Sequence, residues 1–166
     1  PAPKSTQATT ADGKTIVVFS DDLDRALASL VIANGAAAMG KKVTLFFTFW
    51  GLNVIKKPHA PRVKKDFMAK AFGAMMPSSA SELKLSRLNM MGLGSKMMGK
   101  RMANQKIASV DEMLQSAIAN GVELLACQMS MDVMGVTEAE LREGVKIGGV
   151  ATYLEEAEQS NVNLFI

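Results

Sequence analysis

The chain has 166 residues, of which 48% are hydrophobic and 21% charged, a balance that suits one globular domain with a sizeable core. Its single cysteine excludes an intramolecular disulfide, a CxxC redox motif and a cysteine-based zinc site, and it favours a reducing compartment such as the cytoplasm. The formal net charge of +3 hides an asymmetry, because residues 56–106 hold twelve of the 19 Lys and Arg residues but two of the 16 acidic ones.

The chain predicts a regular alternation of strands and helices. Residues 1–13 are polar and lack the apolar core of a secretory signal, so we expect a flexible tail ahead of one domain over residues 14–166. In chain order, hydrophobic periodicity and capping residues predict a strand over 14–20, a helix over 23–39, strand 42–49, helix 66–76, helix 109–120, strand 122–127, helix 137–144, strand 147–152, helix 153–160 and a closing strand over 163–166. Residues 128–135 predict a short connection with a helical turn.

This alternation predicts an α/β fold of three layers. The sheet is expected to be open, mainly parallel and five-stranded, with helices on both faces. A basic, Met-rich helical insertion is expected at about residues 56–106, with a capping-box pattern at 79–82. No apolar run is long enough to span a bilayer.

The basic Met-rich segment, residues 56–106, holds eight of the thirteen methionines. Three interpretations of it stay open. It could form a contact with a partner or another subunit, because Met side chains adapt to varied surfaces. It could lie on an anionic membrane surface, or it could be a local helical subdomain with Met inside and Lys outside. Nucleic acid is a poor fit, because few aromatic side chains are available to stack on bases.

Polar or reactive side chains follow three of the predicted strands. In an open α/β sheet the ligand site lies at the carboxyl ends of the strands. Ser20 and Asp21 follow the first strand, and Trp50 follows the second. The third strand is followed by a third group, made up of Cys127, Met129 and Ser130. If these strands are neighbours, the three loops share one edge of the sheet.

Cys127 is the one strong nucleophile in this set. Backbone N–H groups at the start of a helical turn would stabilise its thiolate, with Ser130 as a further donor. A buried apolar role is the alternative, since free cysteines often fill cores. Asp21 has a similar alternative as part of a helix start. The chain's one histidine, His59, lies in a Pro-rich turn and is a poor partner for a Cys–His pair.

Other cofactor signals are missing from the sequence. No His/Asp/Glu cluster has metal-ligand spacing, and no GxGxxG follows the first strand, so we expect neither a metal nor another cofactor.

Three stretches resemble the DsrE/DsrF/DsrH-like family, and most closely its DsrE2-type sulfur-carrier branch. They are residues 46–52 (FFTFWGL), 85–92 (LSRLNMMG) and 126–135 (ACQMSMDVMG), with Ser20-Asp21-Asp22 of the opening unit. The resemblance covers nearly everything after residue 13. It implies a sulfurtransferase that takes up sulfane sulfur as a persulfide on Cys127 and passes it to a partner thiol.

The resemblance also implies the partners. These are rhodanese-like or TusA-like proteins, or small sulfane-sulfur compounds, and the chain is expected to form a homo-oligomer. The alternative function is a non-catalytic oligomeric or membrane-surface module that acts through residues 56–106. A weaker third option is a small-ligand-binding protein.

Overall fold

The structure is a computed structural model that describes residues 11–61 and 63–166. The tail predicted over residues 1–13 therefore lies almost entirely outside the described residues. A single five-stranded sheet has the order β4-β3-β2-β1-β5, and every neighbouring pair is parallel. The strands are β1 (Gly13–Val18), β2 (Val43–Phe47), β3 (Glu123–Cys127), β4 (Val145–Gly148) and β5 (Ser160–Phe165). The predicted α/β class and the five-stranded parallel sheet are confirmed.

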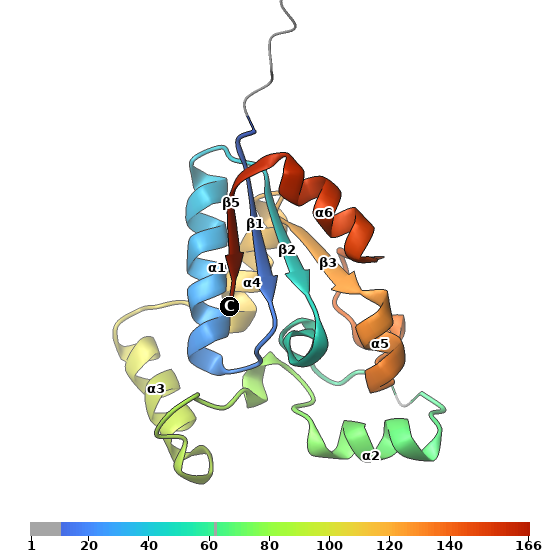
Figure 1. The fold of residues 1–166 in the computed structure, drawn as a ribbon. Coiled ribbons are helices and arrows are strands. Elements are labelled where there is room, and N and C mark those ends of the chain that lie inside the picture. Colours follow the sequence, from blue (N-terminus) through green and yellow to red (C-terminus); the bar gives the residue numbers. More distant parts are fainter. Residues whose placement is uncertain (1–10, 62) are drawn as a thin grey trace, which may run out of the picture.

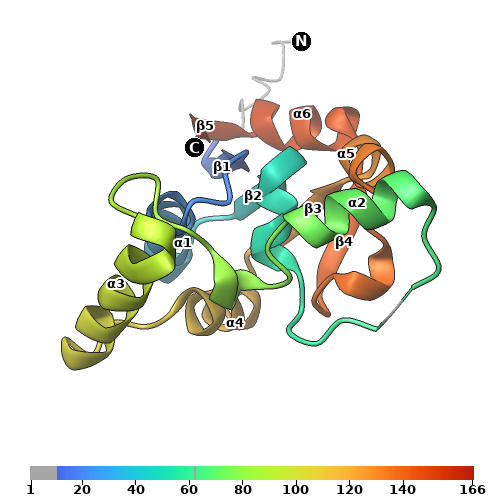
Figure 2. The same cartoon turned by 90° about the horizontal axis from the view of Figure 1, so that it is seen from below.

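Helices cover both faces of the sheet, and right-handed crossovers decide which helix lies where. The chain moves in one direction from β1 through α1 (Leu23–Ala38) to β2, and onward through α4 (Val110–Ala119) to β3, so α1 and α4 share a face. It returns across the sheet from β4 through α6 (Val150–Glu158) to β5, which puts α6 on the opposite face. Figure 2 shows the sheet between these two layers.

The two faces are packed very differently. The face under α1 and α4 holds the main core, whose fully buried side chains include Leu45, Phe47, Leu114 and Leu124. The face under α6 holds a small cluster of Val17, Phe46, Leu125 and Cys127, with Tyr153 of α6 packed against it. No residue of α6 itself is buried. The face under α1 and α4 is therefore densely packed, whereas α6 covers the other face and buries none of its own residues completely.

Two predicted elements near the carboxyl terminus are displaced. The strand predicted over 147–152 is β4 and ends at Gly148, and α6 begins at Val150, three residues before the predicted start. A side-chain carbon on Gly148 would lie 2.8 Å from Leu125 Cδ1, so the glycine allows close packing where the chain turns into the helix. The helix predicted over 137–144 is wrong. Only the 3₁₀ turn η4 (Glu138–Glu140) forms, because Leu141 leaves it to bridge Lys56.

The chain between β2 and α4 contains short helices. The unpredicted 3₁₀ helix η1 (Phe49–Ile55) is buried from Gly51 onward, whereas Trp50 is exposed. It is followed by α2 (Phe67–Met75), the turns η2 (Ala80–Glu82) and η3 (Met90–Gly92), and α3 (Leu93–Asn104). Figure 1 shows α2 and α3 beyond the carboxyl ends of the strands. Neither α2 nor α3 has a buried residue.

Of the capping boxes expected at 79–82 and 109–112, only the second forms. Ser109 and Glu112 form the reciprocal pair at the start of α4. The pattern at 79–82 does not cap a helix, because Glu82 accepts hydrogen bonds from the backbone N–H and hydroxyl of Ser78 instead. Within the described part of the chain, no helix is long and apolar enough to cross a membrane.

Candidate functional site

The carboxyl ends of β1, β2 and β3 lie side by side at one edge of the sheet. β2 pairs with β1 on one side and with β3 on the other, so the three loops that were predicted to share an edge do so. The edge is extended by α2, which meets the end of α5 (Gln128–Met134). A side-chain carbon on Gly135 would lie 2.3 Å from Ala69 Cβ.

Cys127 is the last residue of β3 and the N-cap of α5. Alternation along the strand points its side chain to the same face as Leu125, toward α6 and away from α1 and α4. The backbone turns from strand to helix at this residue, so the first N–H groups of α5 lie next to it in sequence. Cys127 is 1% exposed, which answers the accessibility question that the sequence leaves open.

An aromatic pair lies in the small cluster that holds this thiol. Tyr153 stacks on Phe46 with ring centroids 5.0 Å apart, and both rings belong to the cluster that holds Cys127. Gly148 pairs with Cys127 across the sheet and contributes no side chain. Tyr153 was not predicted as a site residue, and its position in a short helix after the cysteine motif carried no signal of this role.

Ser130 lies in α5 and is fully buried, and its hydroxyl is 2.8 Å from the hydroxyl of Thr48. This bond joins the ends of β2 and β3. Two other predicted neighbours are exposed, Met129 by 51% and Trp50 by 43%. At this edge of the sheet Trp50 and Met129 are therefore exposed to solvent, whereas Cys127 and Ser130 are buried.

Ser20 and Asp21 stabilise the first loop through hydrogen bonds. The Ser20 hydroxyl donates to Asp22 Oδ2 at 2.9 Å and accepts from the Asp22 backbone N–H at 3.0 Å. Asp21 accepts from the buried Asn53 side chain at 2.8 Å, which ties the ends of β1 and η1 together. These contacts favour the structural interpretation of both residues. Asn53 was missed, although an Asn inside the apolar run 49–55 is the kind of signal that marks a buried polar contact.

A second buried polar group lies next along the chain. Lys56 is 5% exposed, and burial lowers the pKa of its ammonium, with Glu140 and Asp21 acting in the opposite direction. Nearby, Lys65 and Glu140 form an ion pair of 2.7 Å, and both side chains are largely shielded from solvent. Hydrogen bonds from Lys65 and Thr137 outweigh the effect of burial and lower the pKa of Glu140.

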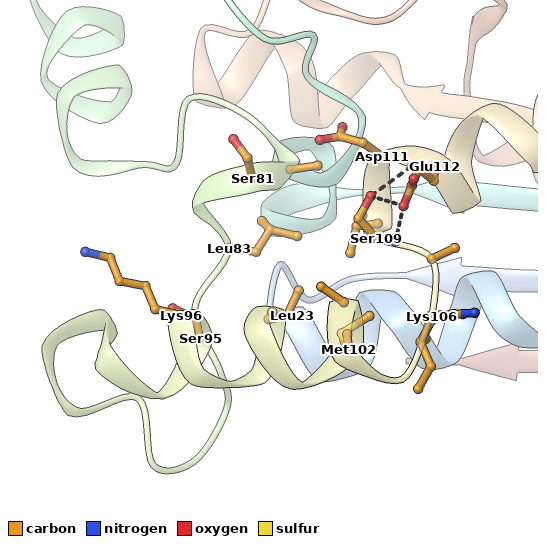
Figure 3. Close-up of a pocket in the computed structure, with 16 residues that line it drawn as sticks. Leu23, Ser81, Leu83, Ser95, Lys96, Met102, Lys106, Ser109, Asp111 and Glu112 are labelled. Carbon is orange, nitrogen blue, oxygen red and sulfur yellow. Dashed lines mark hydrogen bonds between the residues drawn. The ribbon is translucent and has the colours of Figure 1, made fainter.

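An apolar hollow of about 660 Å³ lies between α3, the start of α4 and η2 (Figure 3). On α3 the lining residues are Ser95, Lys96, Gly99, Met102 and Ala103, and Lys106 lines the hollow just after the helix ends. The lining includes none of Cys127, Ser130 or Tyr153, so this hollow is separate from the thiol. Across the described residues, no group of three or more His, Cys, Asp or Glu side chains could hold a metal ion.

Comparison with known proteins gives a consistent family match. Residues 11–165 match the model of the DsrE/DsrF/DrsH-like family. The chain is 45% identical over 152 residues to the Bacillus subtilis protein YrkE, described as uncharacterized, covering 92% of this chain and 95% of that one. It is 32% identical over 155 residues to the sulfur carrier protein DsrE2 of Allochromatium vinosum, covering 91% and 96%.

Solved structures share the fold at low sequence identity. The ychN protein of Escherichia coli has a TM-score of 0.55 at 11% identity, covering 93% of this chain and 99% of that one. MTH1491 of Methanobacterium thermoautotrophicum, titled a protein of unknown function, has a TM-score of 0.54 at 12% identity, covering 93% and 100%. These two matches support the architecture of the sheet and its helices.

Proposed function

This chain belongs to the DsrE/DsrF/DrsH-like family, and from that premise we propose that it is a sulfur carrier that holds sulfane sulfur as a persulfide on Cys127. The observation that carries the proposal is the position of the chain's single thiol. It ends a central strand, precedes the first turn of α5 and lies in a chain 32% identical to a protein named as a sulfur carrier.

The transfer needs one thiolate and two partners. The Cys127 thiolate attacks the terminal sulfur of a persulfide R–S–SH, the donor S–S bond breaks, and R–S⁻ leaves with the bonding electrons. A partner thiolate then attacks the terminal sulfur of the Cys127 persulfide, and the Cys127 thiolate is released. Rhodanese-like or TusA-like proteins are the proposed donors and acceptors, and the proposed setting is the cytoplasm. With thiosulfate as a small donor, the Cys127 thiolate attacks its sulfane sulfur, the S–S bond breaks, and sulfite leaves with the bonding electrons.

The burial of Cys127 adds a requirement to this chemistry. A thiol that is 1% exposed cannot meet a donor unless its cover moves. Tyr153 is the one side chain of α6 in the Cys127 cluster, and α6 has no buried residue to hold it down. We therefore assign α6 as the element that opens, with Tyr153 as its cover over the thiol.

A homo-oligomer is part of the same proposal. The edge strand β5 exposes Val162 and Phe165, the second by 71%, and leaves α6 free to open. A second copy covering these side chains would remove apolar area and the unpaired edge of β5 from water. Analytical ultracentrifugation of the wild type and Phe165→Asp tests this, and a monomeric wild type would contradict it.

Loading tests the carrier itself. The protein is incubated with inorganic polysulfide, desalted, and its intact mass is measured beside that of Cys127→Ser. We expect the wild type to gain sulfur atoms that dithiothreitol removes, and the variant to gain none. Equal gain by both proteins, or no gain by the wild type, would overturn the proposal.

A second candidate function is a membrane-surface module acting through the basic Met-rich segment. The outward side of α3 carries Leu93 and Met97, exposed by 53% and 65%, beside Lys100 and Arg101. On α2, Phe67 and Met75 are more than four-fifths exposed. Apolar side chains flanked by cations are the pattern of helices that lie on anionic bilayers.

Co-sedimentation with liposomes tests this second function. We expect binding to vesicles that contain phosphatidylglycerol, loss of binding at high salt, and weaker binding for the double variant Lys100→Gln, Arg101→Gln. The matched control Lys41→Gln, Lys42→Gln removes the same charge next to β2. Equal binding by the two double variants would contradict a role for α3.

A further inference from the structure

A hollow of about 660 Å³ lies beside α2, separate from the apolar hollow of Figure 3 and from Cys127. It is bounded by the segment that follows η1, by one side of α2 and by the residues leading into η2. The charged and polar side chains that matter are Lys56, Lys70, Glu140, Ser79 and the chain's only histidine, His59. Its volume is in the range of small-ligand sites in proteins.

Lys56 lies in the wall of this hollow in a fixed position. Its backbone forms an antiparallel bridge with Leu141, flanked by hydrogen bonds of 3.0 Å from Lys57 N to Glu140 O and from Arg142 N to Ile55 O. The residue is 5% exposed. The backbone is therefore held on both sides, and burial limits the conformations open to the side chain.

The ammonium of Lys56 is short of acceptors. It has three N–H donors. Within the described part of the chain its one hydrogen bond goes to Pro77 O and is 3.5 Å long, at the outer limit for such a bond. None of the ion pairs formed by residues 11–61 and 63–166 includes Lys56. A buried charge in this state is costly unless something else compensates it.

The two carboxylates in the lining are already engaged. Glu140 accepts from Lys65 on one oxygen and from the Thr137 backbone N–H and hydroxyl on the other, at 2.7–3.0 Å. Glu82 accepts the backbone N–H and hydroxyl of Ser78 at 2.9 and 2.8 Å. No ion pair or hydrogen bond joins either acid to Lys56, and Glu140 and Asp21 favour its charged form only at longer range, so an anion that enters the hollow would be its first direct counter-charge.

Further donors face the same space. The hydroxyls of Ser79 and Ser81 are 2.7 Å apart, and since one donates to the other, one hydroxyl hydrogen remains available. Lys70 of α2 and His59 of the segment after η1 also line the hollow. Lys56, Lys70 and a serine hydroxyl therefore offer donors from three separate elements.

We propose that this hollow is a binding site for a small oxyanion of the sulfate, thiosulfate or phosphate class, held by Lys56 as its buried cation. Lys70 and the Ser79–Ser81 pair complete the set of donors. The site does not depend on the chemistry of Cys127. It gives residues 56–82 a role in recognising a small charged solute.

The wild type supplies its own probe of this site. His59 is the only histidine, so its ring gives one resolved imidazole signal in ¹H–¹³C NMR spectra. We expect sodium thiosulfate, sulfate or phosphate to shift this signal in a saturable way at constant ionic strength, with sodium chloride as the reference. The ranking of the three anions identifies the preferred class. A shift no larger than that of chloride for all three would overturn the proposal.

Two matched variants locate the cation. Lys56→Met replaces the buried ammonium with an apolar side chain of similar length, and Lys64→Met removes the same charge from an exposed position outside the lining. We expect Lys56→Met to weaken binding about tenfold or more, since it removes a charge-assisted hydrogen bond. Lys64→Met should bind as the wild type does.

Thermal unfolding gives an independent readout, because an anion that binds only the folded state raises Tm. The rise should be present in the wild type and Lys64→Met and absent in Lys56→Met. Equal rises in all three proteins would show general salt stabilisation and overturn the site. If Lys56→Met does not fold, the His59 titration of the wild type still decides the proposal.

Discussion

The sheet and the basic Met-rich segment differ in how far their apolar side chains are buried. Strands β1, β2 and β3 are almost wholly buried and share a core of aliphatic and Phe side chains. Helices α2 and α3 bury no residue and expose Met, Leu and Phe. The sheet holds the Cys127 thiol in a buried position under α6. The basic Met-rich segment instead keeps its apolar side chains in contact with solvent. Apolar content alone therefore does not mark a core, and the predictions below test this difference.

Glycine substitutions should separate the two regions most sharply. A side-chain carbon on Gly51 would lie 1.9 Å from Val18 O, a backbone atom that cannot move away. We expect Gly51→Ala to cost more than about 3 kcal/mol or to prevent folding. On α2, nothing lies within 4 Å of the same carbon on Gly73. Gly73→Ala should be neutral or stabilise by up to about 1 kcal/mol in urea unfolding.

Truncation of apolar side chains should show the same contrast. Leu45 is fully buried in the main core, and Met75 is 84% exposed on α2. We expect Leu45→Ala to lower the free energy of unfolding by about 2–5 kcal/mol. Met75→Ala should change it by less than about 0.5 kcal/mol. A large loss from Met75→Ala would mean that α2 packs against something more than the structure shows.

The cover over Cys127 can be loosened without touching the sheet. Tyr153→Ala removes the ring that stacks on Phe46. We expect the rate of Cys127 alkylation by iodoacetamide to rise about fivefold, because about 1 kcal/mol of aromatic packing is lost. Tyr153→Phe keeps the ring and should leave the rate unchanged. Leu154→Ala, at an exposed position of α6, controls for general loosening of the helix.

The smallest expected effect is a pH dependence at Lys56. Burial lowers the pKa of this ammonium in the folded chain, and the unfolded chain keeps the ordinary value of 10.5. Between these two values the unfolded chain binds more protons, so Lys56 makes stability rise with pH. In anion-free buffer Lys56→Met should be the more stable protein at neutral pH, and its advantage should narrow toward pH 10.5. Lys64→Met should show no such trend.

Much of the sheet was predictable because apolar, β-branched runs and helical spacing agree over residues 14–47 and 109–127. The start of α6 was not, because Val150 and Thr152 are β-branched and favour a strand by composition. There the close packing of Gly148 on Leu125 ends β4, and this contact is made in three dimensions only. Likewise the apolar run of β2 continues without a break into η1, so the sequence does not show that the strand ends at Phe47.

The position of Cys127 in the fold was predictable from the sequence, but its burial was not. Chain order places Cys127 at a strand end, and the observed sheet order puts that end at the same edge as the loops of Ser20 and Trp50. A strand buried on both faces does not reveal which way its last side chain points. The burial of Cys127 under Tyr153, and the Ser130–Thr48 bond, depend on elements far apart in the chain. The role of Lys56 was hidden in the same way, since a lysine in a basic segment is expected to be solvated.

Loading of sulfur onto Cys127 and its transfer to an acceptor thiol test most directly the claim that this chain is a sulfur carrier. The protein is loaded with polysulfide, desalted, and divided, and one half is mixed with a small acceptor thiol. Peptide mass spectrometry then follows the Cys127 peptide in both halves. We predict added sulfur on this peptide before the acceptor and unmodified Cys127 after it, with the missing sulfur on the acceptor. A Cys127 peptide that never gains sulfur, or that keeps it in the presence of the acceptor, would contradict the account.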